Sequence, residues 1–160
     1  MEGDAVMGRL TLVFLLVVVC FSGYAVAQDR TFGLGVIIGE PTGPSFKFWT
    51  GSTTAIDGAV AWSLSKNNAL HLHADYLYHN FSLIQVEKGK LPFYFGIGGR
   101  IKIVEGKKDD KIGVRIPVGL DYLFADTPLD IFVEVVPVLD LVPDTDLDFN
   151  GAVGIRYLFK

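Results

Sequence analysis

The alternation that decides the fold is clearest in Ile112-Gly113-Val114-Arg115-Ile116-Pro117-Val118-Gly119-Leu120-Asp121-Tyr122-Leu123-Phe124. Large apolar residues occupy every second position of this stretch, and small or charged residues fill most positions between them. A period of two places the two sets on opposite faces of a β-strand. The stretch is therefore predicted to form one strand with an apolar face and a face rich in glycine and charge.

The same period of two recurs along the rest of the chain. Alternating segments lie at 32–39, 45–49, 55–64, 70–79, 93–102, 129–140 and 148–159. Residues typical of turns separate them, such as Glu40-Pro41-Thr42-Gly43 and Asp126-Thr127-Pro128, and short turns join antiparallel neighbours. We therefore expect an all-β fold, a closed antiparallel up-and-down transmembrane β-barrel of about eight strands.

The volume of the apolar set decides which face lies inside. Its many aromatic and branched side chains exceed what the interior of a narrow barrel holds, whereas glycine, alanine and paired charges suit a narrow lumen. Charged side chains facing lipid would each be costly, so we expect a lumen charge network. Its predicted members are Lys47, Asp57, Asp75, Arg100, Arg115, Asp121, Glu134 and Arg156. Arg115 is expected to reach Glu134, and Arg100 to approach the same carboxylate.

Two further features are predicted from the strands themselves. Aromatic residues end several apolar faces, as an interfacial girdle requires. They are Tyr76, Tyr78, Tyr122, Phe124, Tyr157 and Phe159. Pro117 and Pro137 lie inside strong strand segments. Because proline cannot donate a ladder hydrogen bond, we expect a local bulge at each.

The N-terminal segment has the pattern of a secretory signal peptide. Arg9 precedes the short apolar run Leu10–Phe21, and Ala25-Val26-Ala27 provides a small-x-small cleavage site at Ala25 and Ala27. We expect residues 1–27 to be removed and 28–160 to form the barrel in the outer membrane of a diderm bacterium. Translation could begin at Met1 or Met7.

Several segments resemble known outer-membrane barrels. The C-terminus Ala152-Val153-Gly154-Ile155-Arg156-Tyr157-Leu158-Phe159 resembles the assembly signal that ends such barrels, with Gly154, Tyr157 and Phe159 as its key residues. Segments 73–79, 91–100, 115–122 and 132–137 resemble a family of small barrels first described from spirochaetes. The resemblance implies an eight-stranded fold of the OmpA/OmpX type and contact with the barrel-assembly machinery and membrane lipid. It implies no biochemical activity.

Other functions find little support in the sequence. No basic stripe with interleaved aromatic residues indicates nucleic-acid binding, and the net charge is −4. His71 and His73 share one face and are weak candidates for zinc ligands, so no metal and no cofactor are expected. We expect a non-enzymatic protein with a plugged lumen, in a structural role or contacting an unknown surface partner. The alternatives are a membrane-embedded lipid hydrolase or acyltransferase and a soluble periplasmic ligand-binding barrel.

Overall fold

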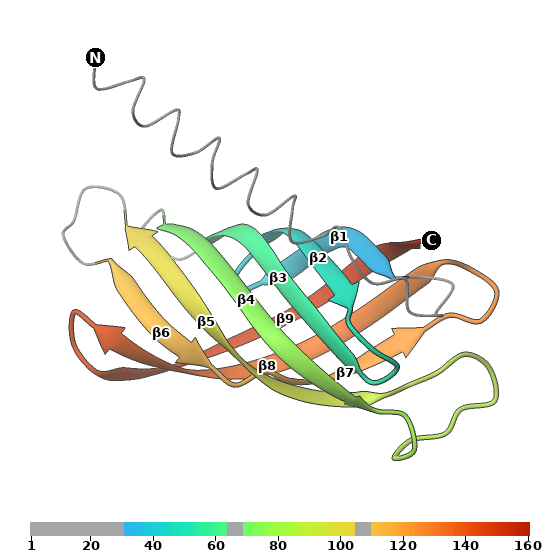
Figure 1. The fold of residues 1–160 in the computed structure, drawn as a ribbon. Helices are drawn as coiled ribbons and strands as arrows, with labels where there is room; N and C mark the ends of the chain where they lie inside the picture. The colour runs from blue at the N-terminus through green and yellow to red at the C-terminus, as the bar shows by residue number, and fades with distance from the viewer. Residues whose placement is uncertain (1–30, 64–68, 105–109) are drawn as a thin grey trace.

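The computed structural model describes residues 31–63, 69–104 and 110–160. The predicted signal peptide, with its cleavage residues Ala25 and Ala27, lies outside the described residues. Every regular element in the described ranges is a β-strand (Figure 1). The strands are β1 (Phe32–Gly39), β2 (Gly43–Trp49), β3 (Thr54–Ser63), β4 (Ala69–Asn80), β5 (Phe93–Val104), β6 (Lys111–Arg115), β7 (Val118–Leu123), β8 (Leu129–Val142) and β9 (Asp146–Phe159). No helix in these ranges is long and apolar enough to span a membrane.

The strands close into one antiparallel ring. The strands from β1 to β5 pair with their sequence neighbours, β8 pairs with β9, and β1 pairs with β9 from Phe32↔Phe159 to Gly39↔Ala152. The stretch that the sequence predicts as one strand appears as β6 and β7, which both pair with β5 and β8. The two therefore share one position in the ring, and the prediction of a closed antiparallel barrel is confirmed. Closure leaves no sheet edge with unpaired backbone groups.

The two strand prolines behave differently from each other. Ile116 and Pro117 interrupt the strand between β6 and β7, although Ile116 N–H still donates to Pro137 and the Pro117 carbonyl still accepts from Gly96. Pro137, in contrast, lies within β8 and pairs with Phe149 of β9. Its carbonyl accepts a hydrogen bond from the amide of Ile116, so its missing N–H donor also faces the break between β6 and β7. The bulge expected at Pro137 is therefore wrong, and the register shift lies instead at Ile112/Gly113.

The two ends of the barrel differ. At one end, called here the termini end, β1 begins and β9 ends, and residues 81–92 extend outward from between β4 and β5 (Figure 1). At the other end, called the mouth, short connections join β1 to β2 and β8 to β9. The position of each residue along the barrel is given below relative to these two ends.

Candidate functional site

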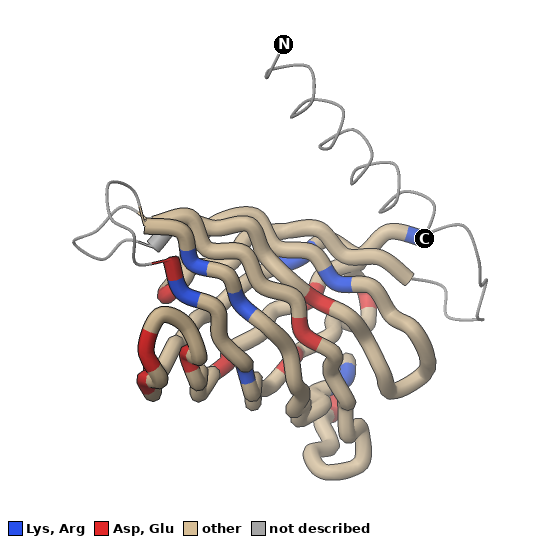
Figure 2. Tube along the Cα trace, turned by 60° about the vertical axis from the view of Figure 1, so that its left-hand side comes forward, with Lys and Arg blue, Asp and Glu red and all other residues tan. Residues whose placement is uncertain are grey.

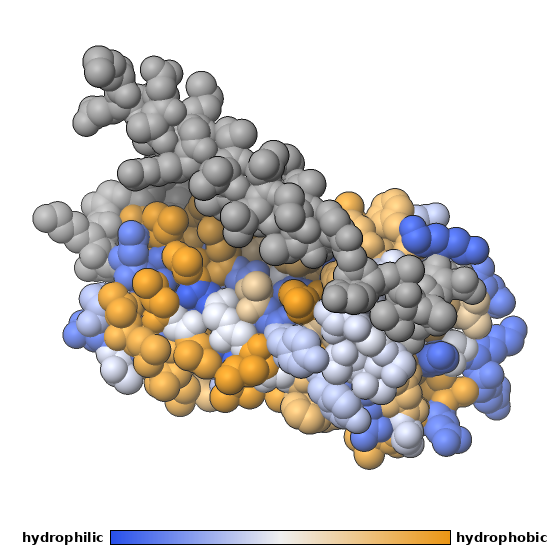
Figure 3. All heavy atoms as spheres, viewed as in Figure 1, coloured by the Kyte–Doolittle hydropathy of each residue, from blue (hydrophilic) through white to orange (hydrophobic). Residues whose placement is uncertain are grey.

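Burial alternates along each strand, with the apolar side chains outside. The pattern from Leu129 to Val142 runs almost strictly between buried and exposed positions. Among the exposed side chains, Val133 is 46% exposed, Val135 57% and Val153 51%. Figure 3 shows hydrophobic residues over the described part of this outer wall. A soluble barrel buries its apolar set, whereas this barrel exposes it on the outer wall.

The interior is charged. The structure places all of the predicted lumen residues, Lys47, Asp57, Asp75, Arg100, Arg115, Asp121, Glu134 and Arg156, inside the barrel, each at most 5% exposed. Figure 2 shows acidic and basic positions along neighbouring strands. The largest side chains with almost no exposed surface include three arginines together with Tyr94 and Phe132. Long side chains therefore fill the cross-section of the lumen.

Toward the termini end, each of two cations has a close carboxylate partner. Arg156 Nε donates to both oxygens of Asp130, at 3.0 and 3.2 Å, and its Nη1 lies 3.4 Å from Asp57 Oδ2. Asp130 and Arg156 are register neighbours on β8 and β9. Lys47 Nζ forms an ion pair with Asp121 and lies 2.9 Å from His79 Nε2. Since an ammonium group only donates, His79 Nε2 acts as the acceptor.

In the middle of the lumen, Arg115 lies between two carboxylates. Its Nε is 3.0 Å from both oxygens of Asp75, and its Nη2 is 3.5 Å from Glu134 Oε1. The contact with Glu134 is the one predicted from the sequence. The closer contact with Asp75 crosses Gly98, which is the register neighbour of both residues. Because Gly98 has no side chain, the guanidinium reaches the second strand away.

The position predicted for Arg100 is corrected by the structure. Its guanidinium pairs with Asp140, through Nε–Oδ1 at 2.9 Å and Nη2–Oδ2 at 2.7 Å, and lies 2.9 Å from Asp148 Oδ2. It does not share the carboxylate of Glu134. Gly113 is the register neighbour of both Arg100 and Asp140. The fork of Arg100 therefore crosses this glycine toward the mouth, where Lys111 lies 3.1 Å from the same Asp140.

Aromatic side chains close the termini end. The ring of Trp49 lies 4.5 Å from the ring of His79 and 6.1 Å from that of Phe81. Lys47 Nζ stands 4.4 Å from the centroid of Trp49, within cation–π range. Phe81 belongs to the connection 81–92, so this connection contributes a side chain to the closure.

The two candidate zinc ligands are neighbours without a completed site. His71 and His73 lie on β4 with their rings 5.5 Å apart at a steep angle. In the described ranges, no group of three or more His, Cys, Asp or Glu side chains is arranged to hold a metal ion. Both histidines are instead buried in the lumen, where His73 is the register neighbour of Arg100 and His71 that of Lys102 on β5.

Several members of the network lie outside the eight residues predicted for it from the sequence. These are Tyr94, Asp130, Asp140, Asp148, Asn150 and His79. All of them alternate with the apolar residues of their strands, so the period of two could have assigned them to the lumen face. Their partners lie across glycines or across the lumen, which local alternation does not reveal.

An aromatic girdle surrounds the termini end on the outside. Neighbouring rings meet at 5.6 Å for Tyr78 and Phe95, 4.8 Å for Tyr122 and Phe124, and 4.9 Å for Tyr157 and Phe159. Tyr157 and Phe159, two residues of the predicted assembly signal, face outward in this girdle. Gly154, the third, lies against the ring of Phe132 in the lumen.

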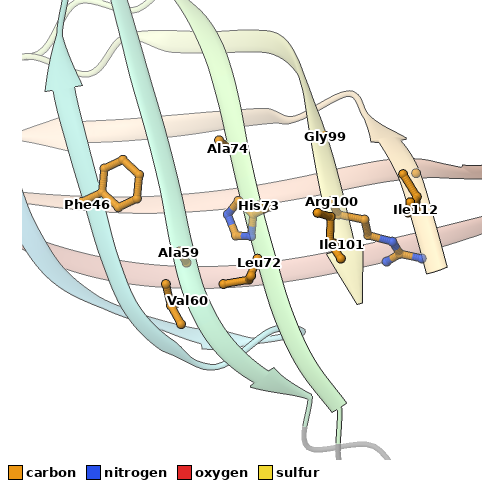
Figure 4. Close-up of a pocket in the computed structure, with 11 residues that line it drawn as sticks. Phe46, Ala59, Val60, Leu72, His73, Ala74, Gly99, Arg100, Ile101 and Ile112 are labelled. Atoms are coloured by element: carbon orange, nitrogen blue, oxygen red, sulfur yellow. The ribbon is translucent and has the colours of Figure 1, made fainter. Parts of the chain in front are cut away.

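A shallow groove of about 440 Å³ crosses the outer wall over β3, β4, β5 and β6 (Figure 4). One side is a row of register neighbours, Val60, Leu72, Ile101 and Ile112. The small residues Ala74 and Gly99, also register neighbours, form part of the opposite side, near Phe46. The groove therefore belongs to the apolar outer wall and not to the charged lumen.

Comparison with known proteins places this architecture among known barrels. A model of the family described as "Protein of unknown function (DUF3996)" matches residues 25–159. A similar solved structure is the N-terminal β-barrel domain of OprF from Pseudomonas aeruginosa. The likeness has a TM-score of 0.63 at 13% identity and covers 82% of this chain and 98% of that domain. No protein with a curated description matches the chain.

Proposed function

The chain belongs to the DUF3996 family, proteins of unknown function, and we propose that it is an integral outer-membrane β-barrel whose filled lumen suits it to a structural or surface-contact role. The observation that carries the proposal is the inverted distribution of side chains. Buried arginines and carboxylates line the interior, while valine, isoleucine and aromatic residues cover the outside. Only an apolar solvent makes this arrangement favourable.

The outer wall supports a location in a membrane. Its exposed aliphatic side chains form a continuous belt, and the aromatic girdle marks one border of it. Tyrosine and tryptophan favour the interface between lipid and water because their rings are apolar and carry one polar group. A soluble ligand-binding barrel would instead present its charged set to water, so the belt favours the membrane location.

The closed lumen supports a function without transport or chemistry. Arginine, tyrosine and phenylalanine side chains fill the interior, and an aromatic cluster closes the termini end. A barrel of this strand number has little interior space even before it is filled. We therefore favour a scaffold over a lipid-modifying enzyme.

The proposal includes a route for export and for assembly of the barrel. Residues 1–27 would direct export, and the C-terminal strand would engage the barrel-assembly machinery. The OprF-like fold agrees with the expected OmpA type of barrel and supports an outer-membrane location. The outward position of Tyr157 and Phe159 leaves both rings available for recognition during assembly.

Two measurements test the proposal. The protein, expressed in full in a diderm bacterium, should remain in the membrane pellet after washing with alkaline carbonate, and its first residue should be Gln28. Purified barrel in a planar lipid bilayer should give no steady single-channel conductance. Recovery in the soluble periplasmic fraction would overturn the membrane location. Stable open channels would overturn the filled lumen.

A further inference from the structure

The middle of the lumen and its termini side contain more carboxylates than cations. We call this group the inner charge cluster. Its charged members are Lys47, Arg115 and Arg156 against Asp57, Asp75, Asp121, Asp130 and Glu134, each at most 5% exposed. Among the described lumen residues, this leaves an excess of two negative charges if every carboxyl is ionised. An uncompensated buried charge costs several kcal/mol, and buried groups usually become neutral instead.

The charges at the mouth do not remove this excess. Among the described residues there, Arg100 and Lys111 form ion pairs with Asp140, Asp146 and Asp148, so both cations already have carboxylate partners at the mouth. The nearby histidines offer no compensation either. His79 Nε2 accepts from Lys47, and within the described ranges the buried His71 Nδ1, His71 Nε2 and His73 Nδ1 have no hydrogen-bond partner. A positive imidazolium there would leave an N–H group unsatisfied.

The geometry identifies which carboxyls are in excess. Each cation has one close partner: Lys47 has Asp121, Arg115 has Asp75 and Arg156 has Asp130. Two carboxyls remain, and both make longer contacts with an arginine that is already paired. Asp57 lies 3.4 Å from Arg156, and Glu134 lies 3.5 Å from Arg115. Asp57 Oδ1, like Asp121 Oδ1, is buried and has no hydrogen-bond partner among the described residues.

The surroundings of these two residues disfavour further negative charge. Asp57 is the register neighbour of Asp75 on β4 and of Lys47 on β2. Side chains directly opposite in an antiparallel pair are about 5 Å apart, and like charges there are destabilising. Glu134 faces Arg115 from β6 and Tyr94 from β5, whose hydroxyl lies 3.1 Å from Oε2. Its register neighbours, Gly119 and Ala152, carry no charge.

We propose that Asp57 and Glu134 bind protons in the folded barrel at neutral pH, so that the inner charge cluster is electrically neutral. Each of the three remaining carboxylates then pairs with one cation. Two neighbouring buried carboxyl groups normally coexist only when one of them is protonated. The proposal depends on the burial of the cluster and not on where the barrel resides. It can therefore fail while the proposed membrane function stands.

The decisive experiment combines infrared spectroscopy with unfolding of the full barrel in lipid vesicles. Wild-type protein at neutral pH should show the carbonyl stretch of protonated carboxyl groups. Asp57→Asn and Glu134→Gln replace a neutral acid by a neutral amide of the same shape, so each should remove part of that band. Each should also change the unfolding constant by less than a factor of about ten, which corresponds to about 1.4 kcal/mol. Asp121→Asn, the matched control, should unfold far more readily because Lys47 loses the carboxylate with which it forms its ion pair.

Proton linkage provides an independent readout. Unfolded carboxyls are ionised above about pH 5, so the unfolded chain releases the two protons. Between pH 7 and 8 the wild-type unfolding constant should rise by up to about 100-fold, tenfold for each proton. The double variant Asp57→Asn/Glu134→Gln should lose this slope. The proposal is overturned if both proteins show equal slopes or if the carboxyl band is missing. It is also overturned if the amide variants are as unstable as Asp121→Asn. The same holds if stability depends on sodium and not on pH, because sodium ions would then neutralise the excess charge.

Discussion

The Tyr94 hydroxyl lies 3.1 Å from Glu134 Oε2 although two strand spacings separate the residues. Gly119 is the register neighbour of both, and a Cβ placed there would lie 2.5 Å from Tyr94 Cζ. Neighbouring strands are about 4.8 Å apart, so the side chain spans roughly twice that distance over the glycine. Arg115 reaches Asp75 over Gly98, and Arg100 reaches Asp140 over Gly113, in the same way. Lumen glycines therefore provide the space through which the network is connected.

Gly98→Ala should destabilise the barrel, whereas Gly99→Ala should not. A Cβ at Gly98 would meet the Asp75 carboxylate and a backbone carbonyl, so we expect a cost of about 1–3 kcal/mol from overpacking. At Gly99, which faces outward, the nearest atom would be 3.8 Å away. Urea unfolding in lipid vesicles, followed by tryptophan fluorescence, measures both. Equal stabilities of the two variants would contradict the role of the lumen glycines.

Val133→Arg should weaken the barrel in lipid. Val133 is 46% exposed on the outer wall, and an arginine on the lipid face costs about 2–4 kcal/mol near the bilayer midplane. Leu83→Arg is the control, because Leu83 is 64% exposed in the connection beyond the strands and should tolerate the change. Folding yields and unfolding free energies in vesicles test this. If Val133→Arg is as stable as Leu83→Arg, the wall does not face lipid.

Arg100 should be energetically coupled to Asp140 and not to Glu134. Asp140→Asn alone should cost about 3–5 kcal/mol, because it removes a partner of a buried guanidinium. Adding Arg100→Met should recover part of that loss. The matching cycle of Arg100→Met with Glu134→Gln should be additive to within about 0.5 kcal/mol. Strong coupling in the second cycle would favour the sequence-based expectation over the observed pairing.

The sequence predicts the strands and their two faces because both depend on local alternation. Each alternating segment contains a strand, and the predicted lumen residues from Lys47 to Arg156 all lie inside. Pairing depends on something less local, namely the register in which the ring closes. Register places Asp140 of β8 beside Arg100 of β5, across Gly113 of β6, although the two residues are far apart in the sequence.

The two prolines show that backbone hydrogen bonding between strands is also not predictable from local sequence. Sequence indicates that Pro117 and Pro137 each remove a donor, but not the direction in which the missing donor points. In the barrel the carbonyl of Pro137 accepts from Ile116, so its nitrogen faces the gap left by Pro117. One interruption of the wall therefore accommodates both residues, and the ladder between β8 and β9 continues past Pro137.

Phe159→Ala should impair assembly in cells more than it impairs stability. The ring of Phe159 faces outward, 43% exposed, and contacts Tyr157 at 4.9 Å and Phe32 at 6.3 Å. Its removal creates no lumen cavity, so refolding into vesicles in vitro should be reduced only slightly. Recognition by the assembly machinery, if it reads the outward aromatic residues that end β9, should be reduced strongly.

Phe149→Ala is the matched control for this prediction. Phe149 is also an outward phenylalanine of β9, 62% exposed, but it lies near the mouth and not at the C-terminus. The amount of each variant in the outer membrane, measured by quantitative immunoblotting of fractionated cells, should be low for Phe159→Ala and near wild type for Phe149→Ala. Equal losses would indicate that any exposed aromatic residue of β9 contributes alike. The C-terminal residues would then carry no special signal.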